Sequence, residues 1–301
     1  KLNAQFGAVT GSATAIGGPV TRLAAGATDN STLSVGLTSS SVGPKSGTVS
    51  VNLATDGTGT SGLPLGSLPA TTISLTGKVY RKAIASAPTQ LDLGNIRTGE
   101  SFAAKQILVR NVALSTDAYS DDLGVTLSGG TGVSVSGSVA RLGAGQSNGT
   151  ALSIGYSGST AAAGLVSGNA TLTYVSKGQV GTGLADAAPL VGSGSVAVSG
   201  KVYRKAEVGV SGTSVNLGNV RLGGTVLGGS VTVSNGATTD GYSDDLGLVL
   251  GGGSNGFTLS GGSARIAAGS GATVGVEFGG STATAGVKSG VLSVGALSKG
   301  Q

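Results

Sequence analysis

Apolar residues in this chain alternate with small polar residues over many short segments. Leu152, Ile154 and Tyr156, for example, occupy every second position. The same period of two recurs at residues 49–53, 73–79, 196–202, 231–233 and 274–278. Such alternation is typical of strands that bury one face. No window of about a dozen residues shows the apolar stripe and capping signals of a helix.

Gly-rich segments and Asn-Gly pairs separate these stretches. The Asn-Gly pairs stand at residues 148–149, 235–236 and 255–256. Pairs of this kind suit turns whose residues need a positive φ. The pattern therefore predicts an all-β fold of short strands and tight turns.

Much of the sequence occurs twice. KVYRKA stands at residues 78–83 and at 201–206, and YSDDLG stands at 119–124 and at 242–247. Further pairs follow in the same order: LDLGNIR at 91–97 with VNLGNVR at 215–221, VARLGAG at 139–145 with SARIAAG at 263–269, and VSKGQ at 175–179 with LSKGQ at 297–301. Because the spacing is nearly constant, we infer a duplicated unit of about 123 residues.

The front of the chain belongs to the same series, since TRLAAGATDNSTLSVGL at 21–37 parallels ARLGAGQSNGTALSIGY at 140–156. We therefore expect a partial repeat at 1–83 whose early strands are missing. A complete repeat would follow at 84–206, and a partial repeat without closing strands at 207–301. Several short strands in a unit of this size indicate tandem immunoglobulin-like β-sandwich repeats.

The composition favours a folded chain with a thin core. Gly supplies 58 of the 301 residues, only 10% are charged and 3% are aromatic, yet 39% are hydrophobic. A disordered chain combines low hydrophobicity with high charge, which is the reverse of this balance. We expect the core to consist of Val, Leu, Ile and Ala.

The chain lacks Cys, His, Met and Trp. It therefore has no disulfides and no thiolate metal ligands, and the commonest catalytic bases and nucleophiles are missing. Glu100, Glu207 and Glu277 stand apart from one another in the sequence, unlike the carboxylate pair of a glycosidase. We expect no enzyme activity, no catalytic residues and no cofactor.

The formal net charge of +5 comes from 18 basic and 13 acidic residues spread along the chain. The largest basic cluster is Lys78, Arg81 and Lys82, with its copy at 201–205. Nucleic-acid binders usually gather more basic residues and interleave aromatic ones, so no nucleic-acid partner is expected. No apolar run is long enough to span a bilayer, and no signal peptide is visible.

The most site-like stretches are AYSDDLG and GYSDDLG. Asp121 with Asp122, and Asp244 with Asp245, are calcium candidates because carboxylate oxygens suit this ion. A good calcium site needs six to eight oxygens, which neither stretch supplies. Aspartates that accept hydrogen bonds from nearby backbone N–H groups at a turn are the alternative, and under it there is no metal site.

Several motifs together resemble the tandem repeats of bacterial choice-of-anchor D surface proteins, which are similar to immunoglobulin-like domains of the ASPM–SPD-2–Hydin type. LDLGNIRTGE and VNLGNVRLGG are each expected to be a strand followed by a Gly turn. ILVRNVA and VTVSNGA are each expected to be an apolar strand that ends in Asn111 or Asn235. The third pair of motifs is SLTGKVYRKA and AVSGKVYRKA. The resemblance covers essentially the whole chain. It implies an extracellular or bacterial cell-surface protein and neither an enzyme nor a known ligand.

Within this resemblance, KVYRKA is the last strand of one unit running into the first strand of the next. Val79 and Val202 are expected to face inward, while Tyr80 and Tyr203 cover the junction. The Arg residues of the motif, at 81 and 204, either grip an anionic glycan or are simply solvated.

Two functions follow as hypotheses. The first is a structural subunit of a bacterial surface fibre, sheath or layer that self-associates as a homopolymer, head to tail by strand donation, because an incomplete sandwich exposes an edge that another strand can fill. Under the rival account, the missing strands are covalently adjacent in a longer chain. The second function is an adhesin or glycan-binding module, which would gather aromatic residues in its loops.

Overall fold

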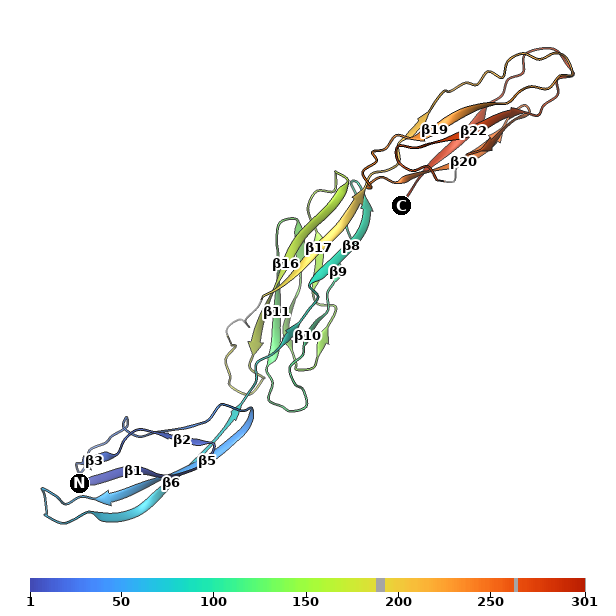
Figure 1. Ribbon diagram of the computed structural model, residues 1–301. Coiled ribbons are helices and arrows are strands. Elements are labelled where there is room, and N and C mark those ends of the chain that lie inside the picture. Colours follow the sequence, from blue (N-terminus) through green and yellow to red (C-terminus); the bar gives the residue numbers. More distant parts are fainter. Residues whose placement is uncertain (188–192, 263–264, 301) are drawn as a thin grey trace.

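The computed structural model describes residues 1–187, 193–262 and 265–300. Every regular element in these ranges is a β-strand, and none of them is a helix, so the all-β prediction is confirmed. Within the same ranges there is accordingly no long apolar helix that could cross a membrane. The strands form three successive groups that lie end to end in an elongated molecule (Figure 1).

The middle group contains two layers of strands. Its strands are β7 (Ala85–Ser86), β8 (Gln90–Arg97), β9 (Lys105–Gln106), β10 (Val109–Asn111), β11 (Asp122–Gly129), β12 (Val133–Ser136), β13 (Ser138–Leu142), β14 (Ser147–Asn148), β15 (Ser153–Tyr156), β16 (Gly164–Lys177) and β17 (Gly194–Tyr203). One layer is the sheet β13-β11-β16-β17-β8, and the other consists of the sheets β14-β10-β7 and β12-β15-β9. Most neighbouring strands are antiparallel, but β8 runs parallel to β17.

Aliphatic side chains from both layers form one continuous buried cluster. Its largest fully buried members are Ile107, Val109, Leu123, Val125, Leu152, Ile154, Leu172, Val196, Val198 and Val202. The period of two read from the sequence explains this core, since every second residue of β17 faces the other layer. Val202 faces inward as expected.

Fewer apolar side chains are buried in the first group than in the middle group. Its strands are β1 (Leu2–Gly11), β2 (Ala13–Ile16), β3 (Val20–Leu23), β4 (Ser34–Leu37), β5 (Gly43–Thr55) and β6 (Gly66–Val79), arranged in the sheets β3-β1-β5-β6 and β2-β4. Val49 is fully buried, whereas Ile73, Leu75 and Val79 are only half-buried. The long antiparallel ladder between β5 and β6 therefore contributes much of the order in this group.

The third group also has a small core. Its strands are β18 (Val208–Val210), β19 (Gly229–Asn235), β20 (Asp245–Gly253), β21 (Phe257–Gly261), β22 (Gly271–Phe278) and β23 (Leu292–Lys299), in the sheets β18-β19-β22-β21 and β20-β23. Val233, Leu246, Ile266 and Val274 are its buried cluster. In the SARIAAG stretch, residues 263–264 lie outside the described residues, and Ile266 pairs with Leu246.

Residues 215–221 differ from the expectation. Their counterpart at 91–97 lies in β8, but 215–221 form no strand. The physical reason is the partner: β8 is ordered by its parallel ladder with β17, and the described part of the third group contains no strand of that kind. The strand prediction for VNLGNVR is therefore wrong for the chain in this state.

The Asn-Gly pairs do not all form the predicted turn with positive φ. Asn255 and Gly256 both have positive φ, at 57° and 84°, and confirm the turn prediction. The pairs at 148–149 and 235–236 have no positive φ, so a turn of that kind was the wrong prediction for both. Asn235 ends β19, and its buried amide forms hydrogen bonds inside the fold.

Candidate functional site at the junctions

The two KVYRKA segments build two matching junctions. At the first junction, the N–H of Arg81 donates to the Tyr119 carbonyl (2.9 Å), and the N–H of Asp121 donates to the Arg81 carbonyl (3.0 Å). At the second junction, the N–H of Arg204 donates to the Tyr242 carbonyl (2.9 Å). Each arginine thereby forms a parallel bridge to the serine of the following YSDD sequence. The repeated KVYRKA sequence therefore forms the same structural arrangement at both junctions.

The arginine side chains lie within the junctions. The Arg81 guanidinium donates to both carboxylate oxygens of Asp117, at 2.6 and 2.9 Å, and to Ser120 Oγ at 3.0 Å. The hydrogen bonds from Arg81 lower the pKa of Asp117, and the same contact raises the pKa of the guanidinium. This two-point geometry fixes orientation more firmly than a single charge contact does.

The second junction repeats this contact. Arg204 Nη1 donates to Asp240 Oδ1 at 2.6 Å and to Ser243 Oγ at 3.1 Å. The pKa of Asp240 is lowered mainly by that hydrogen bond. The hypothesis that Arg81 and Arg204 grip an anionic glycan thus competes with an internal carboxylate at both positions.

A pair of tyrosine rings lies at each junction, and each pair includes Tyr80 or Tyr203, the residues expected there. The rings of Tyr80 and Tyr119 lie 5.5 Å apart in an edge-to-face arrangement. The rings of Tyr203 and Tyr242 lie 6.0 Å apart and are tilted by 51°. Each pair joins the tyrosine of a KVYRKA segment to the tyrosine of the following YSDD sequence.

A buried aspartate lies beneath each junction. Ser176 Oγ accepts from the N–H of Ala83 and donates to Asp121 Oδ2, both at 2.8 Å. Ser298 Oγ links the N–H of Ala206 to Asp244 Oδ2 with the same distances. The serine–aspartate relay therefore holds the chain as it leaves KVYRKA.

The two aspartates differ in one contact. Arg97 at the end of β8 donates its Nε to Asp244 Oδ2 at 2.7 Å, which raises the pKa of the guanidinium. Asp121 Oδ1, in contrast, is buried without a hydrogen-bond partner among the described residues. Within the described part of the chain, the first junction thus has one buried acceptor without a donor.

The neighbouring aspartates form separate ion pairs. Asp122 accepts from Arg141 at 3.0 Å, and Asp245 lies 3.4 Å from Arg265. The described residues contain no group of three His, Cys, Asp or Glu side chains that could hold a metal ion. Calcium binding by Asp121, Asp122, Asp244 and Asp245 remains a prediction without a ligand cluster to support it.

Two buried asparagines connect the layers. Asn111 Nδ2 donates to the carbonyls of Asp121 and Leu142, both at 3.0 Å, and its Oδ1 accepts from the N–H groups of Ile84 and Ala113, both at 3.2 Å. Asn235 makes the matching four bonds in the third group. Both residues were predicted to end strands, and their role as buried hydrogen-bonding groups was not predicted.

Asp117, Asp240 and Arg97 were not predicted as junction residues. A signal was present, because Arg81 and Asp117 are 36 residues apart and Arg204 and Asp240 have the same separation. In a chain with so few charges, an opposite-charge pair that recurs at fixed spacing predicts a contact. The Arg97 contact joins two groups and has no such local signal.

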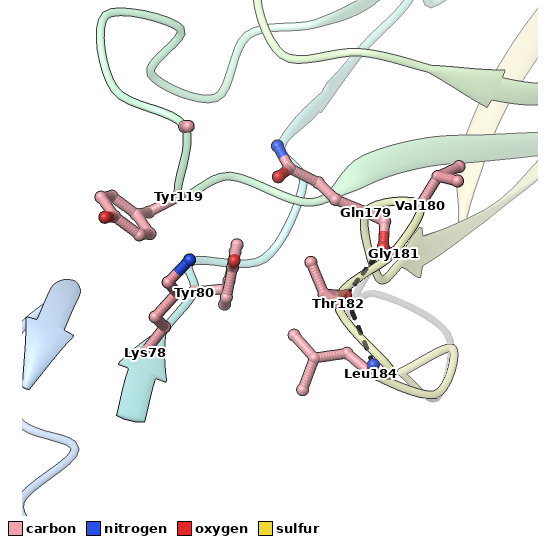
Figure 2. A pocket seen from close by; sticks show the side chains of 9 residues that line it. Lys78, Tyr80, Tyr119, Gln179, Val180, Gly181, Thr182 and Leu184 are labelled. Carbon is pink, nitrogen blue, oxygen red and sulfur yellow. Dashed lines mark hydrogen bonds between the residues drawn. The ribbon is translucent and has the colours of Figure 1, made fainter. Parts of the chain in front are cut away.

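A hollow of about 510 Å³ opens at the first junction. It is bordered by Lys78, Tyr80, Tyr119 and the loop from Gln179 to Leu184, with Tyr80 between Tyr119 and that loop (Figure 2). A hollow of about 210 Å³ at the second junction is bordered by Asn95, Ile96, Arg97, Tyr203 and Asp244.

Comparisons with known proteins give no family. No family model matches the chain, and no curated protein matches its sequence. Among solved structures, a Porphyromonas gingivalis W83 protein of unknown function is similar with a TM-score of 0.29 and 14% identity over 65% of this chain and 83% of that chain. The CsuC–CsuE chaperone–tip adhesion subunit complex of Acinetobacter baumannii Csu pili has a TM-score of 0.28 and 9% identity over 71% of this chain and 99% of that chain.

A third similar structure is the secreted serine protease VesC of Vibrio cholerae, with a TM-score of 0.22 and 10% identity over 72% of this chain and 51% of that chain. TM-scores this low support no inference about function. Membership of the choice-of-anchor D group remains a prediction.

Proposed function

We propose that this chain is a non-enzymatic structural protein, a repeat subunit of an extracellular bacterial fibre, sheath or layer. Its units are immunoglobulin-like β-sandwiches of about 123 residues, divided at 1–83, 84–206 and 207–301. The resemblance to choice-of-anchor D repeats and the shape of the molecule support this proposal, and neither depends on a reactive centre.

The observation that carries the proposal is the repeated junction. The same backbone bridge, arginine–aspartate pair, tyrosine pair and serine–aspartate relay occur at both junctions. Such repetition is what a rod needs, because each unit must set the direction of the next in the same way. A catalytic site, in contrast, needs one distinctive constellation in one place.

The energetics agree with a role in orientation. Arg81 and Asp117 are partly exposed, with side-chain accessibilities of 25% and 34%, so solvent screens the attraction between them. Their contribution lies in the fixed geometry of the contact. The core of the middle group, which is aliphatic throughout its largest buried members, supplies the stability.

The aromatic residues do not favour the adhesin alternative. Eight of the ten aromatic rings are paired with each other: Tyr80 with Tyr119, Phe102 with Tyr156, Tyr203 with Tyr242, and Phe257 with Phe278. These pairs are distributed along the rod. A glycan-binding face would gather such rings at one end, where sugars can stack on them.

Sedimentation velocity of the purified chain over a concentration series tests the proposal. We expect species that grow in steps of 28.4 kDa as concentration rises. A glycan array on the same material distinguishes the alternative: selective glycan binding by a chain that stays monomeric would replace the structural proposal with the adhesin.

A further inference from the structure

The chain enters and leaves the middle group at opposite ends. It comes from the first group through residues 80–84, and it passes to the third group after Tyr203, the last residue of β17. The first and third groups lie at opposite ends of the rod (Figure 1). Tension along the rod therefore pulls β8, near the start of the middle group, toward the first group, and it pulls β17 toward the third group.

These two strands pair directly with each other. β8 runs parallel to β17, from Gln90 opposite Ala197 to Arg97 opposite Tyr203. The load enters at the N-terminal end of one strand and leaves at the C-terminal end of the other, so the pair is pulled in shear. All hydrogen bonds of the ladder then share the load, whereas strands that are pulled apart from one end lose their bonds one after another.

The ladder is the main contact along this path. Hydrogen bonds continue past both of its ends, since the N–H of Ala197 donates to the Thr89 carbonyl (2.9 Å) and the N–H of Thr98 donates to the Tyr203 carbonyl (2.8 Å). The preceding strand β7 has only two residues, which pair with β10. Under tension, β7 is therefore the weaker contact, and the load passes to β8.

The inner face of the ladder is protected from water. Val198 and Val202 of β17 and Leu93 of β8 are buried in the core. Between the two valines, Gly200 leaves space for the buried ring of Phe102, because a Cβ at this glycine would lie 2.6 Å from a ring carbon. Water has little access from this side, so a hydrogen bond that is broken by force is not readily replaced by one to water.

Side chains also occupy backbone groups of β8 and of the turn after it. Asp92 Oδ1 accepts from the N–H of Gly94, and Glu100 Oε2 accepts from the N–H of Arg97, both at 2.9 Å. Lys105 Nζ donates to the Asp92 carbonyl at 2.7 Å. These contacts block groups that an edge strand can offer to another chain. They suit β8 to a fixed position beside β17.

We propose that the β8–β17 ladder is a mechanical clamp, a contact that lets the middle group carry tension along the rod without unfolding. The load enters β8 at Gln90, crosses the ladder in shear and leaves β17 at Tyr203. This inference goes beyond the proposed function, because it concerns the strength of a single chain and does not require that copies assemble.

Single-molecule force spectroscopy with two pairs of handles tests the clamp. The chain has no cysteine, so handles can be attached at engineered cysteines in the full-length protein. Gln90→Cys with Lys205→Cys places the handles at opposite ends of the ladder and loads it in shear. Gln90→Cys with Ser195→Cys places both handles at one end, so that force peels β8 from β17. All three positions are exposed, so each variant should fold.

We expect the shear pair to unfold at a higher force than the peeling pair at the same pulling rate, since forced unfolding depends on the barrier to unfolding. Each event should release about 40 nm of chain, at about 3.6 Å for each residue between the handles. Equal unfolding forces in the two geometries would overturn the proposal.

Two valine variants show whether the ladder itself provides the resistance. Val202→Ala shortens a fully buried side chain of β17 within the ladder, and Val125→Ala shortens a similarly buried one of β11, which β16 separates from β17. Both should lower the denaturant midpoint of the middle group by similar amounts. In the shear geometry, only Val202→Ala should lower the unfolding force clearly. Equal losses of force would place the resistance in the core as a whole and overturn the clamp.

Sedimentation velocity of the parent chain separates this proposal from the proposed function. A monomer at every concentration whose middle group resists shear would support the clamp and overturn self-assembly. Multimers of a chain that unfolds at equal force in both geometries would overturn the clamp and leave the structural function standing.

Discussion

Asn111→Ala tests how the sandwich layers are held together. The side chain is fully buried and makes four hydrogen bonds to backbone groups, two as donor at 3.0 Å and two as acceptor at 3.2 Å. The substitution leaves two carbonyls and two N–H groups without partners. At about 1 kcal/mol for each buried group, the free energy of unfolding of the middle group should fall by about 4 kcal/mol.

Hydrogen–deuterium exchange of the intact chain measures this loss locally, which matters because a chain of several groups does not unfold in one step. A loss of about 4 kcal/mol corresponds to roughly 1,000-fold faster exchange in the protected strands of the middle group, such as β11 and β16. The third group serves as an internal control and should keep its rates. Asn235→Ala should show the reverse pattern, because Asn235 makes the matching bonds there.

Acceleration of less than about 10-fold by Asn111→Ala, or equal acceleration in both groups, would refute the reasoning. In the first case, water entering the space would satisfy the freed groups. In the second, the groups would open together, and the separate cores would not be independent.

Three further predictions concern single contacts. The pKa values of Asp117 and Asp240 in the folded chain lie below the ordinary value, so their carboxylates stabilise the fold above about pH 3.9, and this contribution is lost as pH falls through the folded pKa values. In thermal melts from pH 6 to 2, the melting temperature of the double variant Asp117→Asn/Asp240→Asn should therefore fall less with acid than that of the parent chain. An equal fall in both proteins would contradict this. Gly137→Ala should lower the melting temperature sharply, because Gly137 has φ of 88° and a Cβ would lie 1.8 Å from a backbone oxygen; a melting temperature within about 1 °C of the parent would contradict the turn geometry. Arg97→Ala leaves the buried Asp244 without its charged donor, so small-angle scattering should show a broader range of end-to-end distances than the parent chain; identical profiles would mean that the ion pair does not restrain the second junction.

Periodicity was enough to predict the all-β class and much of the core. Val196, Val198 and Val202 were read from alternation and are buried, because a strand with one covered face leaves little choice of register. The duplicated KVYRKA and YSDDLG letters likewise led to the junctions. The positions of Tyr80 and Tyr203 at the junctions could be predicted from the same repeats.

The contacts within the junctions could not be predicted in the same way. Arg97 and Asp244 are 147 residues apart, so only the folded path of β8 brings them together. The failure of 215–221 to form a strand likewise depends on a missing neighbour, since its sequence hardly differs from that of β8. The local sequence pattern indicates which secondary structure a segment can form, and the presence of a partner strand determines whether that structure forms.

Electron microscopy of the purified chain tests the central claim most directly. If these units form a self-assembling scaffold, concentrated samples will show regular filaments, rings or sheets with a repeat set by one molecule. Fields of dispersed single rods at every concentration would contradict the claim.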